Sequence, residues 1–298
     1  MSYDSILVPT DGSEHATRAT EHALSLASTF GADVHALGVV DIARLAGPFD
    51  AGGIDQGFID RFREEAENDI KHVENQWSQP DRYHGEVREG PPSAEILNYV
   101  AEEDIDLVAM GTHGRSGIER FVLGSVTEHV LRASPVPVLA TRAVEDEPPT
   151  LPYRKVMVPT DGSECADVAI DHALSIADAT GATVHVVYVV DTNVYAVAPG
   201  VETPSDYIEH LEVDGEAVVE DVAEQARAAG VEVETAVVEG RPSAGITSYA
   251  DENDVDVVVM GTHGRSGLER FLLGSTTERV IRGSDLAVIA VPQPDADE

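Results

Sequence analysis

The chain has 298 residues, and its 55 acidic and 19 basic residues give it a formal net charge of -36. Because Lys and Arg do not cluster, neither a nucleic acid nor an anionic membrane surface is an expected partner. No apolar run reaches the roughly 18 residues of a membrane span, and the first residues lack the basic and apolar parts of a secretory signal, so we expect a cytoplasmic protein.

Along the first half, short apolar runs alternate with segments of helical period. Ser13 is placed to cap the first helix, Gly31 suits its end, and Pro92 is placed to start a later helix. Strands that alternate with helices predict an α/β fold whose parallel sheet is doubly wound and covered on both faces. The expected strands are residues 6–8, 34–40, 84–89, 106–110 and 136–140, and the expected helices are 14–29, 58–77, 92–103 and 125–133.

An internal repeat organises the chain. Val-Pro-Thr-Asp-Gly-Ser-Glu at residues 8–14 returns at residues 158–164, and Gly-Thr-His-Gly-Arg-Ser-Gly at residues 111–117 returns at residues 261–267. Each half is therefore expected to be one domain with its own five-stranded, Rossmann-like sheet. The predicted boundaries are domain 1 at 1–143, an acidic, proline-rich linker at 144–152, domain 2 at 153–292 and an acidic tail at 293–298.

The two repeated segments follow the first and fourth strands, where ligands bind in doubly wound sheets. Gly111 and Gly114, followed after nine residues by Gly124 and Ser125, form an anion-binding pattern, because glycine lets backbone N–H groups approach phosphate and permits positive φ. The helix expected from residue 125 directs its positive dipole end at the same place. The alternative is a glycine-rich turn in which Ser125 is an ordinary N-cap.

Other side chains beside these segments suggest further contacts. The Ser125 and Thr127 hydroxyls can donate to phosphate, and Arg115 offers a forked cation. Asp11 can accept from the hydroxyls of a ribose, although it can equally help Ser13 to cap the helix. Val39 ends the second strand, where free backbone groups could meet a purine edge. No G-x-x-x-x-G-K-[ST] sequence occurs, which excludes a P-loop.

With Val-Pro-Thr-Asp-Gly-Ser after the first strand and Met-Gly-x-x-Gly-x9-Gly-Ser after the fourth, the sequence resembles the universal stress protein family over nearly its whole length. The resemblance implies two tandem domains of the adenine nucleotide alpha hydrolase-like fold. The glycine pattern marks the branch of that family that binds ATP, so the resemblance also implies ATP, with Mg2+, as a regulatory or conformational ligand in a stress response. It further implies that the halves pair through their last strands as a pseudo-twofold unit, and leaves a homodimer open.

The same resemblance assigns site residues in each half. In the first half they are Pro9, Thr10, Asp11, Val39, Gly111, Thr112, His113, Gly114, Arg115, Ser116, Gly117, Gly124, Ser125, Val126 and Thr127. In the second half they are Pro159, Thr160, Asp161, Val189, Gly261, Thr262, His263, Gly264, Arg265, Ser266, Gly267, Gly274, Ser275, Thr276 and Thr277. Thr276 departs from Val126, which is harmless if the contact is a backbone N–H.

Two other functions stay open. An ATP-hydrolysing or adenylate-forming enzyme could use the same fold, but the Ser-Gly-Gly-x-Asp-Ser loop of those enzymes is missing, and no catalytic residue is assigned. A pure interaction module would not need intact glycines in both halves. His113 and His263 could touch phosphate or only shape the loop, and no His-x-x-x-His spacing predicts a metal site. Cys165 takes the place of His15, so no nucleophile is common to both halves.

The charge also predicts the working conditions. Lys71 and Lys155 are the two lysines of the chain, and its net charge far exceeds the magnitude of about 2–8 that keeps a small domain soluble. In molar salt the Debye length is about 3 Å, so crowded carboxylates repel one another far less. We therefore expect a halophilic protein. A merely soluble acidic protein is the alternative.

Overall fold

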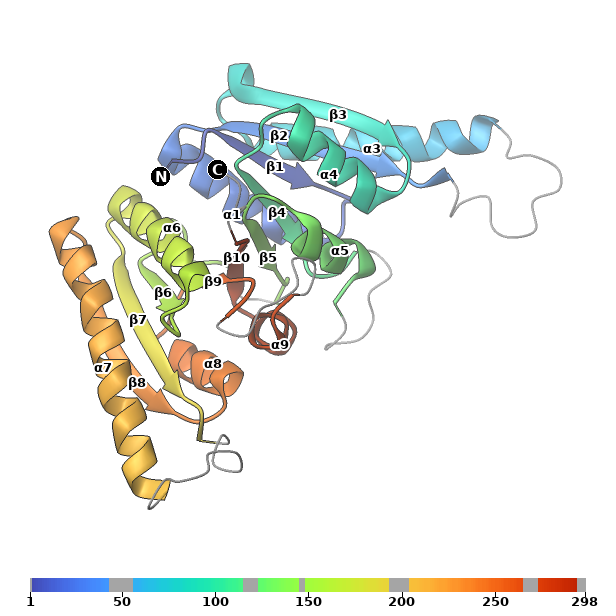
Figure 1. The fold of residues 1–298 in the computed structure, drawn as a ribbon. Coiled ribbons are helices and arrows are strands. Elements are labelled where there is room, and N and C mark those ends of the chain that lie inside the picture. Colours follow the sequence, from blue (N-terminus) through green and yellow to red (C-terminus); the bar gives the residue numbers. More distant parts are fainter. Residues whose placement is uncertain are drawn as a thin grey trace. The chain divides into compact units, whose positions relative to one another are not determined.

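A computed structural model describes residues 2–42, 56–114, 123–144, 148–192, 204–264 and 273–293 (Figure 1). The chain separates into two compact units, Ser2–Pro149 and Thr150–Glu298. None of the helices in the described ranges is long and apolar enough to cross a membrane. Within each unit, strands and helices alternate in the same order.

The first unit contains β1 (Ser5–Pro9), α1 (Glu14–Phe30), β2 (Asp33–Val40), α3 (Gln56–Gln76), β3 (Tyr83–Glu89), α4 (Pro92–Glu102), β4 (Leu107–Gly111), α5 (Ser125–Ala133) and β5 (Val138–Thr141). The second unit contains β6 (Lys155–Pro159), α6 (Glu164–Thr180), β7 (Thr183–Val190), α7 (Pro204–Ala228), β8 (Val233–Glu239), α8 (Pro242–Glu252), β9 (Val257–Gly261), α9 (Ser275–Gly283) and β10 (Ala287–Val291).

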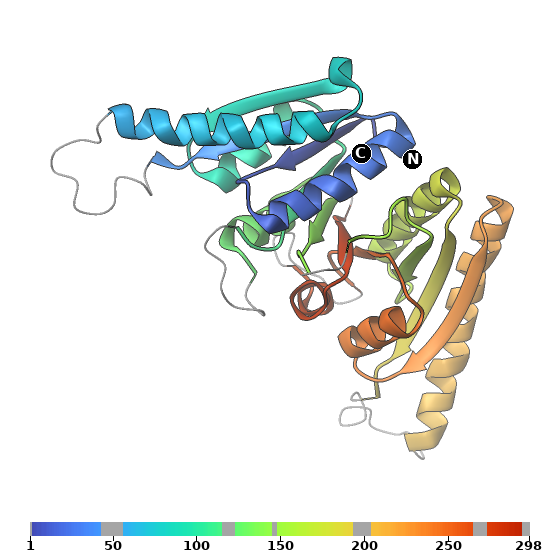
Figure 2. The same cartoon turned by 180° about the vertical axis from the view of Figure 1, so that it is seen from behind.

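The strand order in the first unit is β3-β2-β1-β4-β5, with every pair parallel. The second unit has the equivalent order β8-β7-β6-β9-β10, again all parallel. Helices α1 and α3 cover one face of the first sheet, while α4 and α5 cover the other (Figures 1 and 2). The predicted doubly wound, five-stranded parallel sheet is confirmed in both halves. The pairing of the halves through their last strands stays a prediction.

Local sequence explains where the first helix begins and ends. The Ser13 hydroxyl oxygen accepts a hydrogen bond from the Ala16 N–H at 3.2 Å, and Gly31 closes α1 in the left-handed conformation at φ 70°. Ser163 and Gly181 do the same for α6. Both caps in the first unit are as the sequence predicts, because they depend on residues within one turn of the helix end.

The last strand of the first unit starts later than the sequence predicts. Its expected start, Val136, donates its N–H to the Ser134 hydroxyl at 3.2 Å, and that hydroxyl donates to the Val136 carbonyl at 2.7 Å. This local turn uses the backbone groups that a sheet would need, and Pro137 has no N–H to offer. The strand therefore begins at Val138.

Candidate functional site

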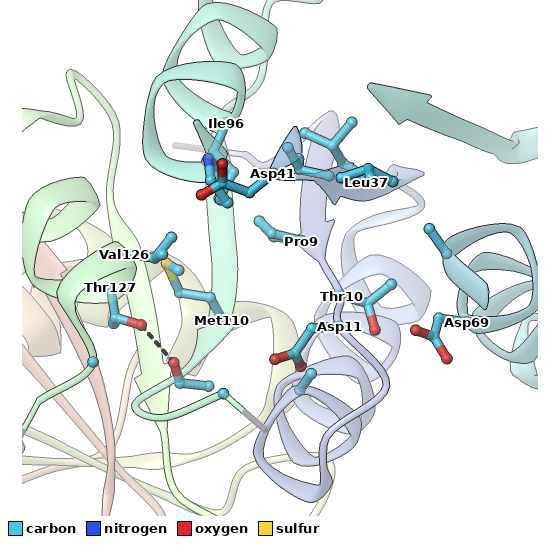
Figure 3. Close-up of a pocket in the computed structure, with 18 of the residues that line it drawn as sticks. Pro9, Thr10, Asp11, Leu37, Asp41, Asp69, Ile96, Met110, Val126 and Thr127 are labelled. Carbon is cyan, nitrogen blue, oxygen red and sulfur yellow. Dashed lines mark hydrogen bonds between the residues drawn. The ribbon is translucent and has the colours of Figure 1, made fainter. Parts of the chain in front are cut away.

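A cavity of about 450 Å3 lies at the carboxyl edge of the first unit's sheet. The ends of β1, β2 and β4 form its floor, and α3, α4 and the start of α5 contribute its walls (Figure 3). The cavity lies where the winding reverses between β1 and β4, which is where doubly wound sheets bind ligands. Its volume is within the range of about 300–1,000 Å3 that small-molecule sites occupy.

Most of the site residues predicted for the first half meet in this cavity. It is lined by Pro9, Thr10, Asp11, Val39, Gly111, His113, Gly114, Gly124, Ser125, Val126 and Thr127. Thr112 is buried behind the lining, where its N–H donates to the Thr141 carbonyl at 2.8 Å. Arg115, Ser116 and Gly117, like their counterparts Arg265, Ser266 and Gly267, lie outside the described residues.

The two carboxylate oxygens of Asp11 face different parts of the structure. One carboxylate oxygen, Oδ1, accepts a hydrogen bond from the Ser13 N–H at 3.1 Å and so shapes the entry to α1. The other oxygen, Oδ2, faces the glycine loop so closely that a Cβ atom on Gly114 would lie 2.5 Å from it. Asp11 and Thr10 lie together at the end of β1 (Figure 3). The carboxylate thus holds the Ser13 N-cap with one oxygen and turns the other toward the glycine loop that lines the cavity.

The N-terminus of α5 faces the cavity from the other side. Gly124, which has no side chain, is the N-cap, so the alternative that Ser125 caps this helix is wrong. Ser125 is instead the first helical residue. Helix geometry leaves the N–H groups of residues 125–127 without partners inside the helix, and the dipole adds partial positive charge at that end. An anion is therefore the kind of group that this part of the cavity favours.

Thr127 does not have the role that we expected for its hydroxyl. The side chain is buried, and its Oγ1 donates a hydrogen bond to the Gly111 carbonyl at 2.8 Å. Its proton is therefore used to tie α5 to the end of β4. The Gly124 N–H adds a second link by donating to the Thr112 carbonyl at 2.8 Å. These two hydrogen bonds fix the start of α5 against the strand.

Gly111 is needed for a reason other than the predicted positive φ. A Cβ atom there would lie 2.6 Å from the His15 Cβ and 2.7 Å from the His15 carbonyl carbon. None of the described loop glycines 111, 114 and 124 has a positive φ. The close approach of α1 to the end of β4 therefore requires glycine at this position.

Two imidazoles meet beside the loop. His113 lines the cavity with only 8% of its surface exposed, and its Nδ1 lies 3.1 Å from the Thr112 hydroxyl. The His15 ring packs against it at 5.3 Å between centroids. Burial lowers the pKa of His15, and a positive charge on His113, like that of the Arg142 guanidinium, lowers that pKa further. Each of these effects disfavours the protonated form of His15.

The cavity also has a wall that sequence reasoning missed. Asp41 extends it from the end of β2, and α3 contributes four further residues, two of them acidic. Asp41 and Met110 recur as Asp191 and Met260, so the internal repeat could have identified them as site residues. The segment that includes α3 hardly matches its counterpart and carried none. The α3 residues of the wall are Phe62, Glu65, Ala66 and Asp69.

The second unit repeats the contacts that build the site. The Asp161 Oδ1 accepts from the Ser163 N–H at 3.1 Å, and a Cβ atom on Gly264 would lie 2.7 Å from the Asp161 Oδ2. The Thr277 hydroxyl donates to the Gly261 carbonyl at 2.8 Å. The predicted residues described at these places are Pro159, Thr160, Asp161, Val189, Gly261, Thr262, His263, Gly264, Gly274, Ser275, Thr276 and Thr277.

An α/β unit that holds a glycine loop and a helix N-terminus at the switch point of its sheet has the layout of a nucleotide-binding protein. The model of the universal stress protein family matches residues 2–142 and 152–292. The chain therefore belongs to the universal stress protein family, with two domains in tandem.

Individual relatives agree with this assignment. The universal stress protein MJ0531 of Methanocaldococcus jannaschii is 37% identical over 142 residues, which cover 48% of this chain and 84% of that protein. A solved universal stress protein of Archaeoglobus fulgidus is 26% identical with a TM-score of 0.71, covering 99% of this chain and 98% of its own. A further solved universal stress protein, in complex with cAMP, is 30% identical over 47% of this chain and 98% of its own; its TM-score of 0.36 adds nothing to the assignment.

Proposed function

We propose that each half binds ATP with Mg2+, and that the nucleotide acts as a regulatory or conformational ligand in a stress response. The observation that carries the proposal is the cavity in the first unit, where the two segments repeated in the sequence meet. Those segments are far apart in the chain, yet Asp11 of one faces Gly114 of the other. A ligand site explains why both segments recur unchanged in the second half.

The cavity offers a suitable surface for each part of the nucleotide. The N–H groups at the start of α5 suit the phosphates, and Ser125 adds a hydroxyl. Apolar side chains of Pro9, Leu37 and Met110 suit the flat base. Asp11 suits a ribose hydroxyl, because its Oδ2 is an acceptor on the cavity side.

A magnesium ion fits the site only together with phosphate. The described residues contain no group of three or more His, Cys, Asp or Glu side chains able to hold a metal by themselves. Mg2+ usually binds through one or two carboxylates, several waters and the phosphates of its substrate. Asp11, whose Oδ2 faces the glycine loop, is the carboxylate that would hold it, with that oxygen then binding the ion in place of a ribose hydroxyl.

Mass spectrometry of the small molecules released from the purified, denatured protein is the first test, because it identifies the ligand without assuming it. Equilibrium dialysis with ATP and with cAMP then gives the number of sites and the preference between these nucleotides. Phosphate release over hours shows whether the bound triphosphate is hydrolysed slowly, for which positioning alone can suffice.

Two glycine variants test the loops. Gly114→Asp places a carboxylate beside the phosphates and opposite Asp11, so it should remove one equivalent of bound ATP, and Gly264→Asp should remove the other. Gly114→Asn is the matched control, because it adds nearly the same volume without the charge and should retain more binding. Full binding by the double Asp variant would refute the assignment of the phosphate loops.

A further inference from the structure

The chain segment that leaves the first unit is held by the first turns of α1. The Ala143 N–H donates a hydrogen bond to the His15 Nδ1 at 2.9 Å, across 128 residues of sequence. The Arg18 guanidinium donates to the Val144 carbonyl at 3.3 Å. Both contacts lie just beyond β5, in the segment that continues in sequence into the second unit. Two side chains of one helix therefore hold the start of the connection between the units.

The same histidine contacts the candidate nucleotide site. The His15 ring packs against the His113 ring at 5.3 Å, and His113 lines the cavity beside Gly114. The His15 backbone also lies against Gly111, at the end of β4. His15 is thus in contact with the loop that lines the cavity on one side and with the departing chain on the other.

The second unit has neither of these two side chains. Cys165 stands where the first unit has His15, and Val168 stands where it has Arg18. The Cys165 thiol lies 3.8 Å from the Val291 carbonyl, a contact within the last strand rather than beyond it. The His15 and Arg18 contacts to the segment after the last strand are therefore a feature of the first unit's sequence.

We propose that His15 is a positioning residue that couples nucleotide in the first unit's cavity to the segment connecting the two units. The proposal rests on the nucleotide site proposed above. Phosphate beside His113 favours a proton on that ring, because an opposite charge stabilises the charged form. Two imidazolium ions at 5.3 Å repel each other, so His15 then stays neutral. Neutral His15 keeps its Nδ1 lone pair for the Ala143 N–H, whereas a protonated ring would lose that acceptor.

Other charged groups around His15 also affect the equilibrium between its neutral and protonated forms, which the nucleotide would shift. The carboxylates of Glu14 and Asp11 favour protonation of His15, and the Arg142 guanidinium opposes it. Nucleotide binding, acting through His113, further opposes the protonation of His15. The expected result is a stronger hydrogen bond at Ala143 when the first cavity is filled.

Hydrogen exchange of the Ala143 amide, measured by NMR on the full chain carrying Gly264→Asp, tests the coupling with ATP at the first site alone. We expect saturating ATP to slow this exchange by at least about fivefold, the lower end of usual coupling between sites. His15→Asn should keep an acceptor near the Nδ1 position but cannot titrate or stack on His113. Its Ala143 amide should exchange slowly with or without ATP.

His15→Cys copies the residue of the second unit and should exchange fast in both states, while still binding ATP. Dialysis on the same samples separates the two proposals. If ATP binds to the Gly264→Asp chain but leaves Ala143 exchange unchanged, the coupling is refuted and the nucleotide site stands. An ATP response in His15→Asn equal to that of the parent would likewise refute the role of His15. If no ATP binds to that chain or to the unmodified protein, the nucleotide site itself is refuted, and the coupling with it.

Discussion

The two units keep the same loops but pack their long helices differently. In the first unit, Gly38 of β2 faces α3, and a Cβ atom there would lie 3.0 Å from the Ala66 Cβ. In the second unit, Tyr188 stands at the equivalent strand position, and a Cβ atom on Gly215 of α7 would lie 2.6 Å from its ring. The first unit therefore brings a glycine of the strand close to an alanine of the helix, whereas the second unit places a tyrosine of the strand against a glycine of the helix.

This difference shows which parts of the domain are free to vary. The contact between strand and helix is made by different residues in the two units, so the sequence there can change while the helix still packs on the sheet. The glycine loops have no such freedom, because their backbone approaches α1 and Asp11 too closely for a side chain. The segments with repeated sequence therefore mark the site. The long helix beside it differs between the units, so the side chains that it contributes to one cavity wall can differ as well.

The largest expected effect tests the Tyr188–Gly215 contact. Tyr188 is buried with 7% of its surface exposed, so Tyr188→Ala should lower the free energy of unfolding by about 3–5 kcal/mol. Urea denaturation in 2 M KCl measures this change. Val213→Ala is the control on the same helix, since Val213 is 59% exposed and its loss should cost less than about 0.5 kcal/mol.

Gly215→Ala sharpens the same comparison. Alone, it should cost about 1–3 kcal/mol, because the added methyl group overpacks the Tyr188 ring. Combined with Tyr188→Ala, it should cost nothing further or stabilise the helix. Strictly additive losses would show that the two residues do not form one packing unit.

A smaller loss of stability, of similar size in both units, should appear as the pH falls. Burial lowers the pKa of His22 in α1 and of His172 in α6 to about 4, whereas each is about 6.5 when unfolded. The unfolded chain therefore binds protons first, so stability is complete above pH 6.5 and is lost as the pH falls toward 4. At pH 5 each histidine should cost about 2 kcal/mol.

Unfolding curves of His22→Gln and His172→Gln between pH 7 and pH 5 measure these contributions. Each variant should lose less stability across this interval than the parent protein, by a similar amount. Protonation of carboxylates affects parent and variants alike, so the difference isolates the histidine. An unchanged slope in either variant would mean that its histidine is not kept neutral by burial.

The smallest effect concerns charge. Between about 0.1 M and 2 M KCl, the free energy of unfolding should rise by on the order of 1 kcal/mol, because screening reduces repulsion among exposed carboxylates. ATP affinity should rise as well, since the anionic ligand meets a less repulsive surface. Melting curves and ATP titrations follow both quantities. A flat or falling trend in both would contradict the halophilic hypothesis and leave the loops as the basis of the nucleotide proposal.

Much of the fold could be predicted because it depends on short segments. The Ser13 cap, the Gly31 stop and the alternation of strand and helix are each set within a few residues. The repeat then located the two loops and most of the cavity's floor. The start of β5 was missed because the Ser134 side chain competes for the backbone groups of Val136.

The sequence by itself determined the fold class, the repeat of the same strands and helices in both halves, and the residues of both loops. Tertiary structure decided how those residues are used: Thr127 bonds the Gly111 carbonyl, Gly124 rather than Ser125 caps α5, and α3 contributes acidic side chains to the cavity. It also decided that His15 meets Ala143 across 128 residues. The physical reason is range: capping and periodicity act within a helical turn, whereas these contacts exist only after distant segments have packed together.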